Sequence, residues 1–566
     1  MKHQPFTSVH QSLAFSRRML LVGGAQAAVG GALVARLGYL AVAQNEKYQL
    51  LSEENRVQLI VVPPRRGWLL DRYGNPIAIN RSDFRVDLVP QQLEYTEQTL
   101  KTLAQLLKLD RDTLDRILKE LKQSRGFQPV QVAESVPYPD YAAVTVRLPE
   151  LPGVQATRGF SRFYPAGPAV AHLVGYVGTA SPQQYEEEDK NPLLITPGFK
   201  VGKAGLEKTL EPYLRGAPGG QRVEVTARGR LIKELEPKPD RSGRTVQLSI
   251  DAALQEFAAR RMGEESGSLV VMDCHTGDIL AFVSMPAYDP NSFSRGIGRT
   301  EWRMLSEDDH LPLLNKITQG LYPPGSTIKP MNALALQANG VDPTERVFCG
   351  GGYQLGNRFF HCLGRHGSVD MRRAIAKSCN TYFYAMGNRI GYDNIAPMAK
   401  RLGLGAKFDL PLVTQNYGTV PNSEWKERKF KDNPKLIERP DWTRSDTLNA
   451  SIGQGYLLLN PLQLAVMAAR IASGRDVQPQ LIGVHKEPAP LLGLPPEQLE
   501  LVRGGMWQVV NGDGTAGASR LPLQGIEMSG KTGTAQVRRI AAGQRGKGGD
   551  WRYRDHGLFV FYAPSD

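Results

Sequence analysis

The sequence lacks the pattern of a nucleic-acid-binding protein, although it is basic. Its 566 residues carry a formal net charge of +13. The Lys and Arg are scattered, however, and no stripe of interleaved basic and aromatic residues occurs. No internal repeat is evident either. We interpret the charge as a generally basic, soluble surface, with proximity to an acidic membrane as the second interpretation. Nucleic acid is not a predicted partner.

The N-terminus lacks a clean small-x-small cleavage site followed by a polar mature start. It does contain a long, mostly apolar run over residues 19–42, and about 20 apolar residues suffice to span a bilayer. Arg17 and Arg18 precede the run, which puts the short tail, residues 1–18, in the cytoplasm. We therefore expect an uncleaved, single-pass anchor in the inner (plasma) membrane, with the rest of the chain extracytoplasmic, rather than a cleaved signal peptide.

The chain is too long for one core and implies several domains. Leucines at helical spacing between residues 95 and 125 predict a small helical insert with the leucines in its core. Residues 237–244 read as a linker, and a second unit begins near Thr245. There, residues 268–284 predict a β-hairpin, 300–475 are mainly helical, and strands resume at 525–540 and 556–563. Strands at both ends with helices between them indicate an α+β fold.

The sequence Tyr-Pro-Pro-Gly-Ser-Thr-Ile-Lys-Pro contains a Ser-x-x-Lys pair, Ser326 and Lys329. If a helix starts at the serine, both side chains lie on one face, about 5–6 Å apart at Cβ. A serine hydroxyl needs an adjacent base, and a lysine amine serves if burial or a second cation lowers its pKa. A second pair, Ser423 and Lys426, is interpreted as surface.

Two later motifs distinguish Ser326 from Ser423. Ser378-Cys379-Asn380 follows it, and then Lys531-Thr532-Gly533-Thr534 on a strand pattern. These resemble the three motifs of the penicillin-binding, serine-active acyltransferases in their usual order. The middle motif is often Ser-Asp-Asn, and here Cys379 replaces the aspartate.

The resemblance covers nearly the whole chain and is closest to the class B penicillin-binding proteins of the elongation type, penicillin-binding protein 2. Further matching segments are Arg66-Gly67, 71–72, 74–80, 175–178, 202–207, 288–291 and 453–456. The family implies a transmembrane helix, a non-catalytic, dimerisation-type pedestal over residues 43–240, and a transpeptidase domain with a serine β-lactamase-like fold over residues 245–566. It also implies peptidoglycan stem peptides as substrates, β-lactams as inhibitors, and a RodA-type membrane glycosyltransferase within the elongation complex as partner.

The motifs suggest a role for each residue. Lys329 is the predicted base for Ser326, Ser378 relays a proton, and Asn380 holds a substrate amide. Lys531 supplies positive charge that helps keep Lys329 neutral. In the segment Thr532-Gly533-Thr534, the two threonines are predicted to bind the terminal carboxylate of the substrate. The backbone N–H groups of Ser326 and Thr534 are predicted to form the oxyanion hole.

Three of the four cysteines cluster in the sequence with one histidine: Cys349, Cys362, His366 and Cys379. Such a set suits tetrahedral structural zinc, and the elongation-type resemblance implies a zinc near this place. No cofactor is expected for the chemistry itself. A Cys349–Cys362 disulfide stays open as the alternative, and His361 is a substitute ligand. Cys274 is given no role.

Other functions stay open at this point. A β-lactamase or β-lactam sensor uses the same three motifs, a division-type class B protein shares the whole organisation, and a scaffold could act mainly through its pedestal. The family also continues beyond the strand that ends this sequence, so we expect the transpeptidase domain to be truncated at Asp566 and protein ending there to acylate poorly.

Overall fold

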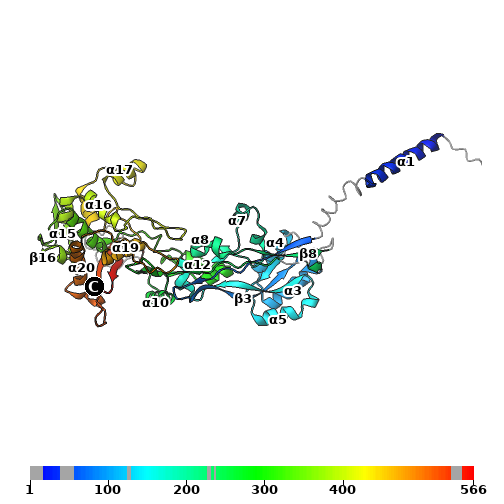
Figure 1. Cartoon of the computed structure of the whole chain (residues 1–566), viewed down its shortest axis with the longest axis horizontal. Helices are drawn as coiled ribbons and strands as arrows, with labels where there is room; N and C mark the ends of the chain where they lie inside the picture. Colours follow the sequence, from blue (N-terminus) through cyan, green and yellow to red (C-terminus); the bar gives the residue numbers. More distant parts are fainter. Residues whose placement is uncertain are drawn as a thin grey trace, which may run out of the picture. The chain divides into compact units, whose positions relative to one another are not determined.

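The computed structural model describes residues 17–38, 57–123, 129–225, 231–234, 238–536 and 551–565 (Figure 1). Most of the predicted cytoplasmic tail, residues 1–16, and the end of the predicted anchor, residues 39–42, lie outside these residues. Helix α1 is Arg17–Gly38. In the described ranges, no helix has both the length and the mean hydropathy needed to cross a bilayer.

The chain divides into two compact units. The first comprises Met1–Val62 and Pro218–Asp240. It contains an antiparallel sheet in the order β1 (Val57–Val62), β8 (Gly219–Val225), β9 (Leu231–Glu234).

The second unit comprises Pro63–Ala217 and Arg241–Asp566. Its N-terminal part is built on the long strand β3 (Pro76–Leu88), which pairs along most of its length with β5 (Val154–Phe163). The other strands of this sheet are β2 (Leu69–Leu70), β4 (Val130–Ala133) and β10 (Val246–Gln247), and β6 (Val177–Gly178) pairs with β7 (Val201–Gly202). The helices here are α3 (Thr96–Leu107), α4 (Arg111–Gln123), α5 (Tyr138–Val146), α6 (Ala171–Val174), α7 (Pro182–Glu187), α8 (Gly205–Thr209) and α9 (Glu211–Leu214).

Helices α3 and α4 form the predicted insert between residues 95 and 125, but not every leucine is in its core. Leu100 and Leu103 are buried, whereas Leu118 is 39% exposed. The neighbouring Ile117 is fully buried in its place. The helix therefore turns Ile117, rather than Leu118, toward the sheet, and the prediction was wrong for that leucine.

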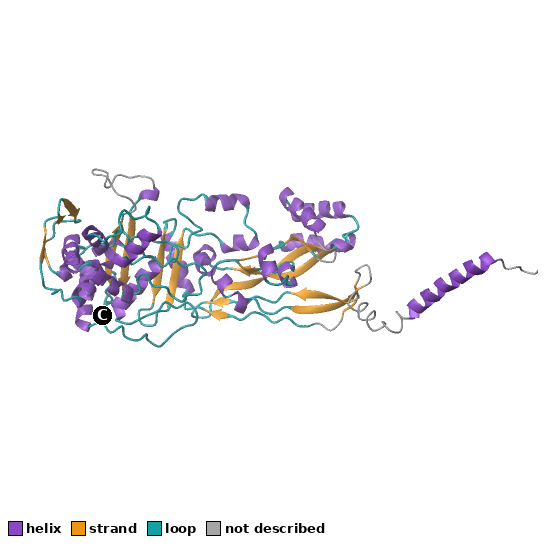
Figure 2. Ribbon diagram, turned by 90° about the horizontal axis from the view of Figure 1, so that it is seen from above, coloured by secondary structure: helices purple, strands orange, loops and turns teal. Residues whose placement is uncertain are grey.

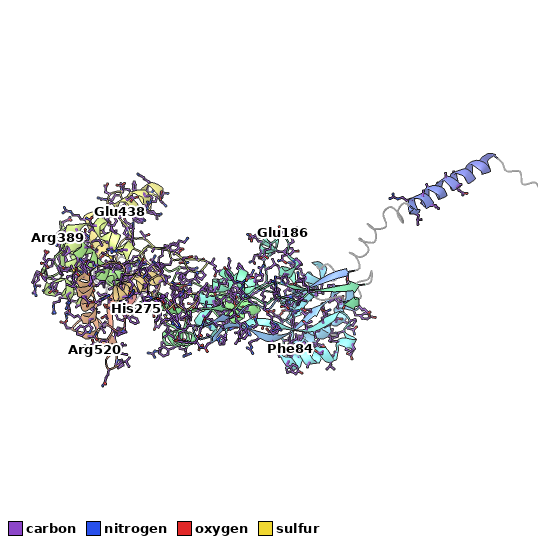
Figure 3. The ribbon with its side chains drawn as sticks, in the orientation of Figure 1. Phe84, Glu186, His275, Arg389, Glu438 and Arg520 are labelled. Carbon is purple, nitrogen blue, oxygen red and sulfur yellow. The ribbon has the colours of Figure 1, made fainter. Side chains whose placement is uncertain are left out.

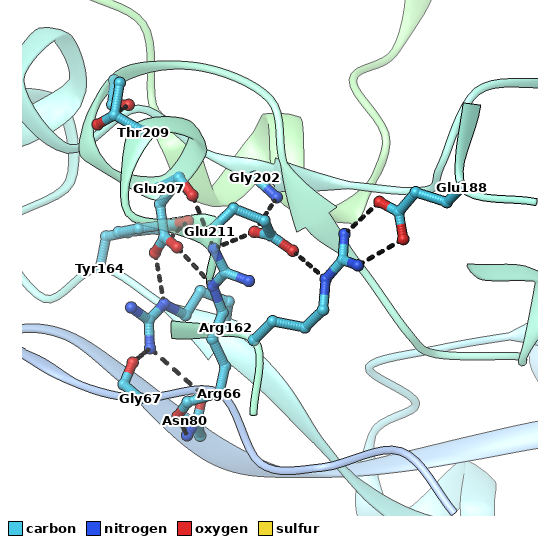
Figure 4. A network of polar contacts seen from close by, with 12 residues as sticks. Arg66, Gly67, Asn80, Arg162, Tyr164, Glu188, Gly202, Glu207, Thr209 and Glu211 are labelled. Atoms are coloured by element: carbon cyan, nitrogen blue, oxygen red, sulfur yellow. Dashed lines mark hydrogen bonds and ion pairs between the residues drawn. The ribbon is translucent and has the colours of Figure 1, made fainter. Parts of the chain in front are cut away.

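A buried ion network holds the N-terminal part together (Figure 4). Glu207 on α8 is fully buried and lies 2.6 Å from both Arg66 and Arg162. Burial alone would raise the pKa of Glu207, but the two guanidinium groups outweigh it and lower that pKa. Arg66 also binds Glu211. Removing one partner would leave a buried charge uncompensated. Two segments that match the family, 66–67 and 202–207, therefore stabilise the N-terminal part through these ion pairs.

The C-terminal part carries two longer pairs of antiparallel strands and a helical core (Figure 2). The hairpin β11 (Gly267–Met272) and β12 (Ile279–Met285) confirms the one predicted at 268–284. The second, β17 (Ser529–Ala535) with β18 (His556–Tyr562), lies within the predicted strands. The helices are α10 (Ala252–Met262), α11 (Pro290–Arg295), α12 (Arg299–Ser306), α13 (Lys329–Ala338), α14 (Met371–Ala376), α15 (Asn380–Ile390), α16 (Tyr392–Arg401), α17 (Ser423–Asp432), α18 (Arg444–Ser451), α19 (Pro461–Ser473) and α20 (Pro496–Asn511).

The region expected to be helical also contains four very short strands. β13 (Val347–Cys349) pairs with β16 (Gly367–Val369), and β14 (Gly352–Leu355) pairs with β15 (Arg358–His361). The large core cluster includes buried residues of α13, α14, α15, α16, α19 and α20. It supports both the Ser326 turn and the cysteine-bearing hairpins.

Candidate active site

Ser326 lies in a 3₁₀ turn, Gly325–Ile328, that leads directly into α13. The expected α-helical start at the serine is replaced by this tighter turn, in which the N–H of Lys329 donates to the carbonyl of Ser326. Pro330 has no N–H, so it cannot make the α-helical bond back to that same carbonyl. Ser326 and Lys329 remain three residues apart at the start of one helix, as the motif requires.

The Ser326 turn is held between two other segments. Gly325 has a φ of +55°, and a Cβ there would lie 2.6 Å from the carbonyl oxygen of Thr534. On the other side its N–H donates to the carbonyl of Gly453 at 2.9 Å. Only glycine allows this approach. The backbone of Thr534 therefore runs beside the residue that precedes Ser326, and the two N–H groups predicted for the oxyanion hole are brought to neighbouring places.

The fully buried amine of Lys329 reaches the middle motif. Its Nζ donates to the carbonyl oxygen of Ser378 at 2.7 Å, to Asn380 Oδ1 at 2.7 Å and to Ser378 Oγ at 3.2 Å. Lys531, also fully buried, donates to the same Ser378 Oγ at 3.0 Å. One hydroxyl thus joins the two lysines of the first and third motifs.

The surroundings of these lysines favour neutral amines. Burial lowers the pKa of Lys329 to about 7, against the opposing effect of the thiol groups of Cys362 and Cys379. Burial, and then repulsion from Lys329, lowers the pKa of Lys531 well below its ordinary value. The repulsion thus acts on the pKa of Lys531, whereas the pKa of Lys329 is lowered by burial, so the predicted effect of Lys531 on Lys329 is not what lowers it. A neutral Lys329 amine can accept a proton.

Acylation by a penicillin is expected to accelerate with rising pH and then level off. Protonated Lys329 cannot act as a base, and its neutral fraction grows as the pH passes its pKa of about 7. Stopped-flow acylation rates between about pH 5.5 and 9 would check this, because general-base catalysis follows the neutral fraction of the base. A rate that falls across this range, or stays flat, would contradict the assignment of Lys329 as the base.

Ser378 adopts a backbone conformation that is rare for a residue with a side chain. Its φ is +53°, and such left-handed conformations cost about 1–3 kcal/mol outside glycine. It connects the end of α14 to the start of α15, where Cys379 is the N-terminal cap and Asn380 the first helical residue. The strained link places the Ser378 hydroxyl between the two lysines.

Asn380 connects the lysines to the cysteine cluster. Besides accepting from Lys329, its Nδ2 donates to the carbonyl of His361 at 3.3 Å, and its backbone N–H donates to Cys362 Sγ at 3.2 Å. The side-chain amide predicted to hold substrate is thus already oriented by Lys329 and the end of β15.

The four residues of the predicted cysteine cluster lie close together in the structure. The ligand atoms of Cys349, Cys362, His366 and Cys379 all lie within 4.8 Å of one another. Cys349 Sγ and Cys362 Sγ are each 3.5 Å from His366 Nδ1. Ligands bound tetrahedrally to zinc at 2.0–2.3 Å stand roughly 3.5–3.8 Å apart. Three thiols and an imidazole at this spacing fit a structural zinc.

The thiols themselves are free, with no disulfide between Cys349 and Cys362. The hydrogen bond from the Cys379 thiol, together with backbone N–H groups that include Asn380, lowers the pKa of Cys362. A thiolate is the form that binds metal. His361, the substitute ligand, is not in the group: its ring packs edge-on against Phe359.

The second Ser-x-x-Lys pair has a different environment. Ser423 bonds to Asp393, and Lys426 pairs with Asp446 at 2.8 Å. Lys426 is buried, so its interpretation as a surface residue was wrong. The amine of Lys426 therefore has a carboxylate partner, whereas the hydrogen bonds of the Lys329 amine go to Ser378 and Asn380.

Three neighbours of the motifs were not found from the sequence. The Lys329 amine lies 5.6 Å from the ring centre of Phe383. Gln454 Nε2 donates to the Thr534 carbonyl at 3.4 Å, and the hydroxyls of Thr515 and Thr532 are 2.6 Å apart. Gln454 lay inside a matched segment, 453–456, but Phe383 and Thr515 had no signal beyond ordinary helix and turn composition.

Comparison with known families agrees with this geometry. Residues 267–566 match the model of the penicillin binding protein transpeptidase domain, and residues 61–248 match that of the penicillin-binding protein dimerisation domain. The chain belongs to the penicillin-binding proteins. Its relatives make it a class B member of the elongation type, a serine D,D-transpeptidase.

Two relatives of this penicillin-binding protein are named peptidoglycan D,D-transpeptidase MrdA. That of Acinetobacter baumannii is 33% identical over 559 residues, covering 94% of this chain and 80% of the relative. That of Escherichia coli K12 is 30% identical over 576 residues, covering 98% and 90%.

Solved structures of penicillin-binding proteins are similar as well. PBP2 of Helicobacter pylori in a complex with MreC has a TM-score of 0.77 at 28% identity, covering 90% of this chain and 92% of that one. PBP2 of Pseudomonas aeruginosa in complex with WCK 5153 has a TM-score of 0.63 at 31% identity, covering 90% of each chain.

Proposed function

We propose that this penicillin-binding protein cross-links peptidoglycan through an acyl-enzyme on Ser326. The observation that carries the proposal is the buried Lys329 amine, which shares the Ser378 hydroxyl with Lys531 and, among the residues that the structure describes, bonds to no carboxylate. A lysine held neutral in this way, next to the Ser326 turn, supplies the base that a serine nucleophile needs.

In the first half-reaction, Ser326 Oγ attacks the carbonyl of the penultimate D-Ala of a stem peptide. Its proton passes to Lys329 Nζ and then, through Ser378 Oγ, to the nitrogen of the terminal D-Ala, which leaves as the C–N bond breaks. The N–H groups of Ser326 and Thr534 stabilise the oxyanion, each worth about 3–4 kcal/mol of barrier. Thr532 and Thr534 hold the terminal carboxylate, with Gly533 between them close against the Ser326 turn.

In the second half-reaction, an amine from a neighbouring stem peptide attacks the ester. A C–N bond forms, the ester C–O bond breaks, and the proton of the amine returns to Ser326 Oγ by the same lysine and serine. β-Lactams imitate the D-Ala-D-Ala end and would acylate the same serine.

Structural zinc is proposed at Cys349, Cys362, His366 and Cys379, because the donor set and its spacing suit that ion. Zinc bound there would brace the hairpins β13–β16 and β14–β15 against the start of α15 and take no part in the chemistry. Cys379 and Asn380 are consecutive, so the ligand set would fix the backbone that carries Ser378 and Asn380.

The location is proposed from the sequence. Residues 19–42 would anchor the chain in the inner membrane in a single pass, with residues 1–18 cytoplasmic and the pedestal (43–240) and transpeptidase domain (245–566) outside. Two arginines before the apolar run support this orientation. A deletion of residues 19–42 that leaves the protein in the alkali-washed membrane fraction would contradict it.

The partners are proposed from the family. One similar structure is a complex of PBP2 with MreC, and a protein of that kind, together with a RodA-type glycosyltransferase, would join this chain to the elongation complex. The pedestal would be the contact region.

Cross-linking can be tested directly with glycan strands that carry pentapeptide stems. The purified protein is expected to produce dimeric muropeptides and free D-Ala, and a Ser326→Ala variant is expected to produce neither. A stable adduct with labelled penicillin would at the same time exclude a β-lactamase, which would turn the compound over. Cross-linking by the purified Ser326→Ala variant would overturn the proposal.

A further inference from the structure

A loop that none of the three motifs includes contacts the third motif and the residue that precedes the second. It spans residues 511–516, directly after α20, and reads Asn-Gly-Asp-Gly-Thr-Ala. Its first residue, Asn511, donates through Nδ2 to the carbonyl of Met528 at 2.9 Å, just before β17 begins. Arg520, exposed at the surface in Figure 3, donates back to the carbonyl of Asn511. The loop is thus fastened at the base of the strand that carries Lys531.

The middle of the loop holds the residue before Ser378. Lys377 Nζ lies 2.9 Å from Asp513 Oδ2 and donates to the carbonyl of Asp513 at 2.5 Å. Arg373, one turn earlier on α14, contacts the same carboxylate at 3.3 Å. These are partly exposed ion pairs, each of small energetic value, but they connect the loop to the segment that presents Ser378.

The end of the loop meets the third motif. Thr515 Oγ1 lies 2.6 Å from Thr532 Oγ1. The position of Thr515 is well determined by its neighbours: a Cβ on Gly514 would lie 2.4 Å from Val509 Cα, and the N–H of Ala516 donates to the carbonyl of Val509 at 2.9 Å. The loop therefore has little freedom to move Thr515 away from Thr532.

The proton count of this hydroxyl pair determines what Thr532 can do. Each threonine hydroxyl has one proton to donate and lone pairs to accept with. A carboxylate is only an acceptor, so Thr532 must donate its proton to bind one. Thr532 is also bonded to Thr515, so its own proton is available for the carboxylate only if the Thr515 hydroxyl is the donor in the bond between the two threonines. Thr515 would then orient the Thr532 proton toward the substrate.

We propose that Thr515 is a positioning residue for carboxylate recognition, acting through the hydroxyl of Thr532, and that the 511–516 loop joins the Ser378 segment to the Lys531–Thr534 segment. The inference rests on the proposed function, because it takes the carboxylate of the stem peptide, or of a penicillin, as the group that Thr532 binds. It predicts that Thr515 affects only ligands that carry that carboxylate.

The test compares a penicillin with its methyl ester, which lacks the negative charge, as acylating agents of the full chain. Thr515→Val removes the hydroxyl and keeps the shape. It is expected to lower the second-order acylation rate constant for the acid about 10-fold, the scale of one hydrogen bond to a charged group, and to change that for the ester less than about 2-fold. Thr515→Ser is expected to restore the rate with the acid.

A double-mutant cycle with Thr532→Val identifies the route of the effect. If Thr515 acts through Thr532, the double variant loses no more with the acid than Thr532→Val alone. Thr102→Val, which removes a hydroxyl bonded to Gln98 on the pedestal helix α3, is the matched control and should leave both rates unchanged. The unchanged ester rate also verifies that Thr515→Val is folded.

Three outcomes would count against the proposal. Equal losses with acid and ester would make Thr515 a general structural residue, and additive losses in the cycle would place its effect elsewhere. Unchanged acid acylation in Thr515→Val would show that Thr532 is oriented without it. Failure of the unmodified protein to form an adduct on Ser326 would instead contradict the proposed function itself.

Discussion

A Lys329→Met variant is expected to lose acylation by penicillin by a factor of about 10³, within the usual range for removing a general base. Its melting temperature should stay level or rise by about 2–4 °C, the shift that 1 kcal/mol produces in a domain of this size. The variant would be inactive and at least as stable as the unmodified protein.

The physical reason is the burial of Lys329. The residue is fully buried, its hydrogen bonds go to Ser378 and Asn380, and burial lowers its pKa to about 7. A lowered pKa means that the folded protein disfavours the charged amine, which is a cost to stability. Methionine fills similar space without a charge, so the cost disappears together with the base.

Lys426 provides the matched control. It is also a buried lysine in a Ser-x-x-Lys pair, but it is bonded to Asp446. Lys426→Met should leave acylation within about 2-fold and lower the melting temperature, because it leaves a partly buried carboxylate without its partner. Loss of acylation in both variants, or a large loss of stability in Lys329→Met, would contradict the account of Lys329.

The second large effect concerns the metal cluster. Purified protein is expected to contain about one zinc per chain. The Cys349→Ser variant is expected to lose this zinc and to have a lower melting temperature. Its acylation by penicillin should be at least about 10-fold slower, the usual scale when residues that support a site are lost. Cys349 is the ligand on β13, and it touches Thr381 on α15 through its sulfur at 3.1 Å. Metal analysis and stopped-flow acylation would measure both effects.

Cys274 is the control for this experiment. It is a free thiol outside the cluster, and burial raises its pKa to about 11. Cys274→Ser should keep the zinc and the acylation rate. Protein that contains no zinc yet acylates at full rate would rule out the structural-zinc proposal, and so would equal effects of the two substitutions.

The sequence was sufficient to predict the residues that meet in the site. The three motifs have a specific order and composition, and the fold joins Lys329 to Lys531 through the hydroxyl of Ser378. The α+β class and the hairpin at 268–284 were also predictable, because alternating apolar residues around a turn are a strong local signal.

Other features depended on tertiary context. Strands of three or four residues, such as Val347–Cys349, are too short to show a period of two. The burial of Lys426 required Asp446, which lies on another helix. The pairing of Thr515 with Thr532 required a loop to fold back on a strand, and no local pattern encodes such a contact.

The most direct test of the account is the mass of the intact protein after incubation with a penicillin, followed by peptide mapping. We expect a stable mass increase equal to one β-lactam, located on the peptide that contains Ser326, absent in Ser326→Ala and unchanged in Ser423→Ala. An adduct on any other residue, an adduct that survives the Ser326→Ala substitution, or rapid release of hydrolysed penicillin would contradict it.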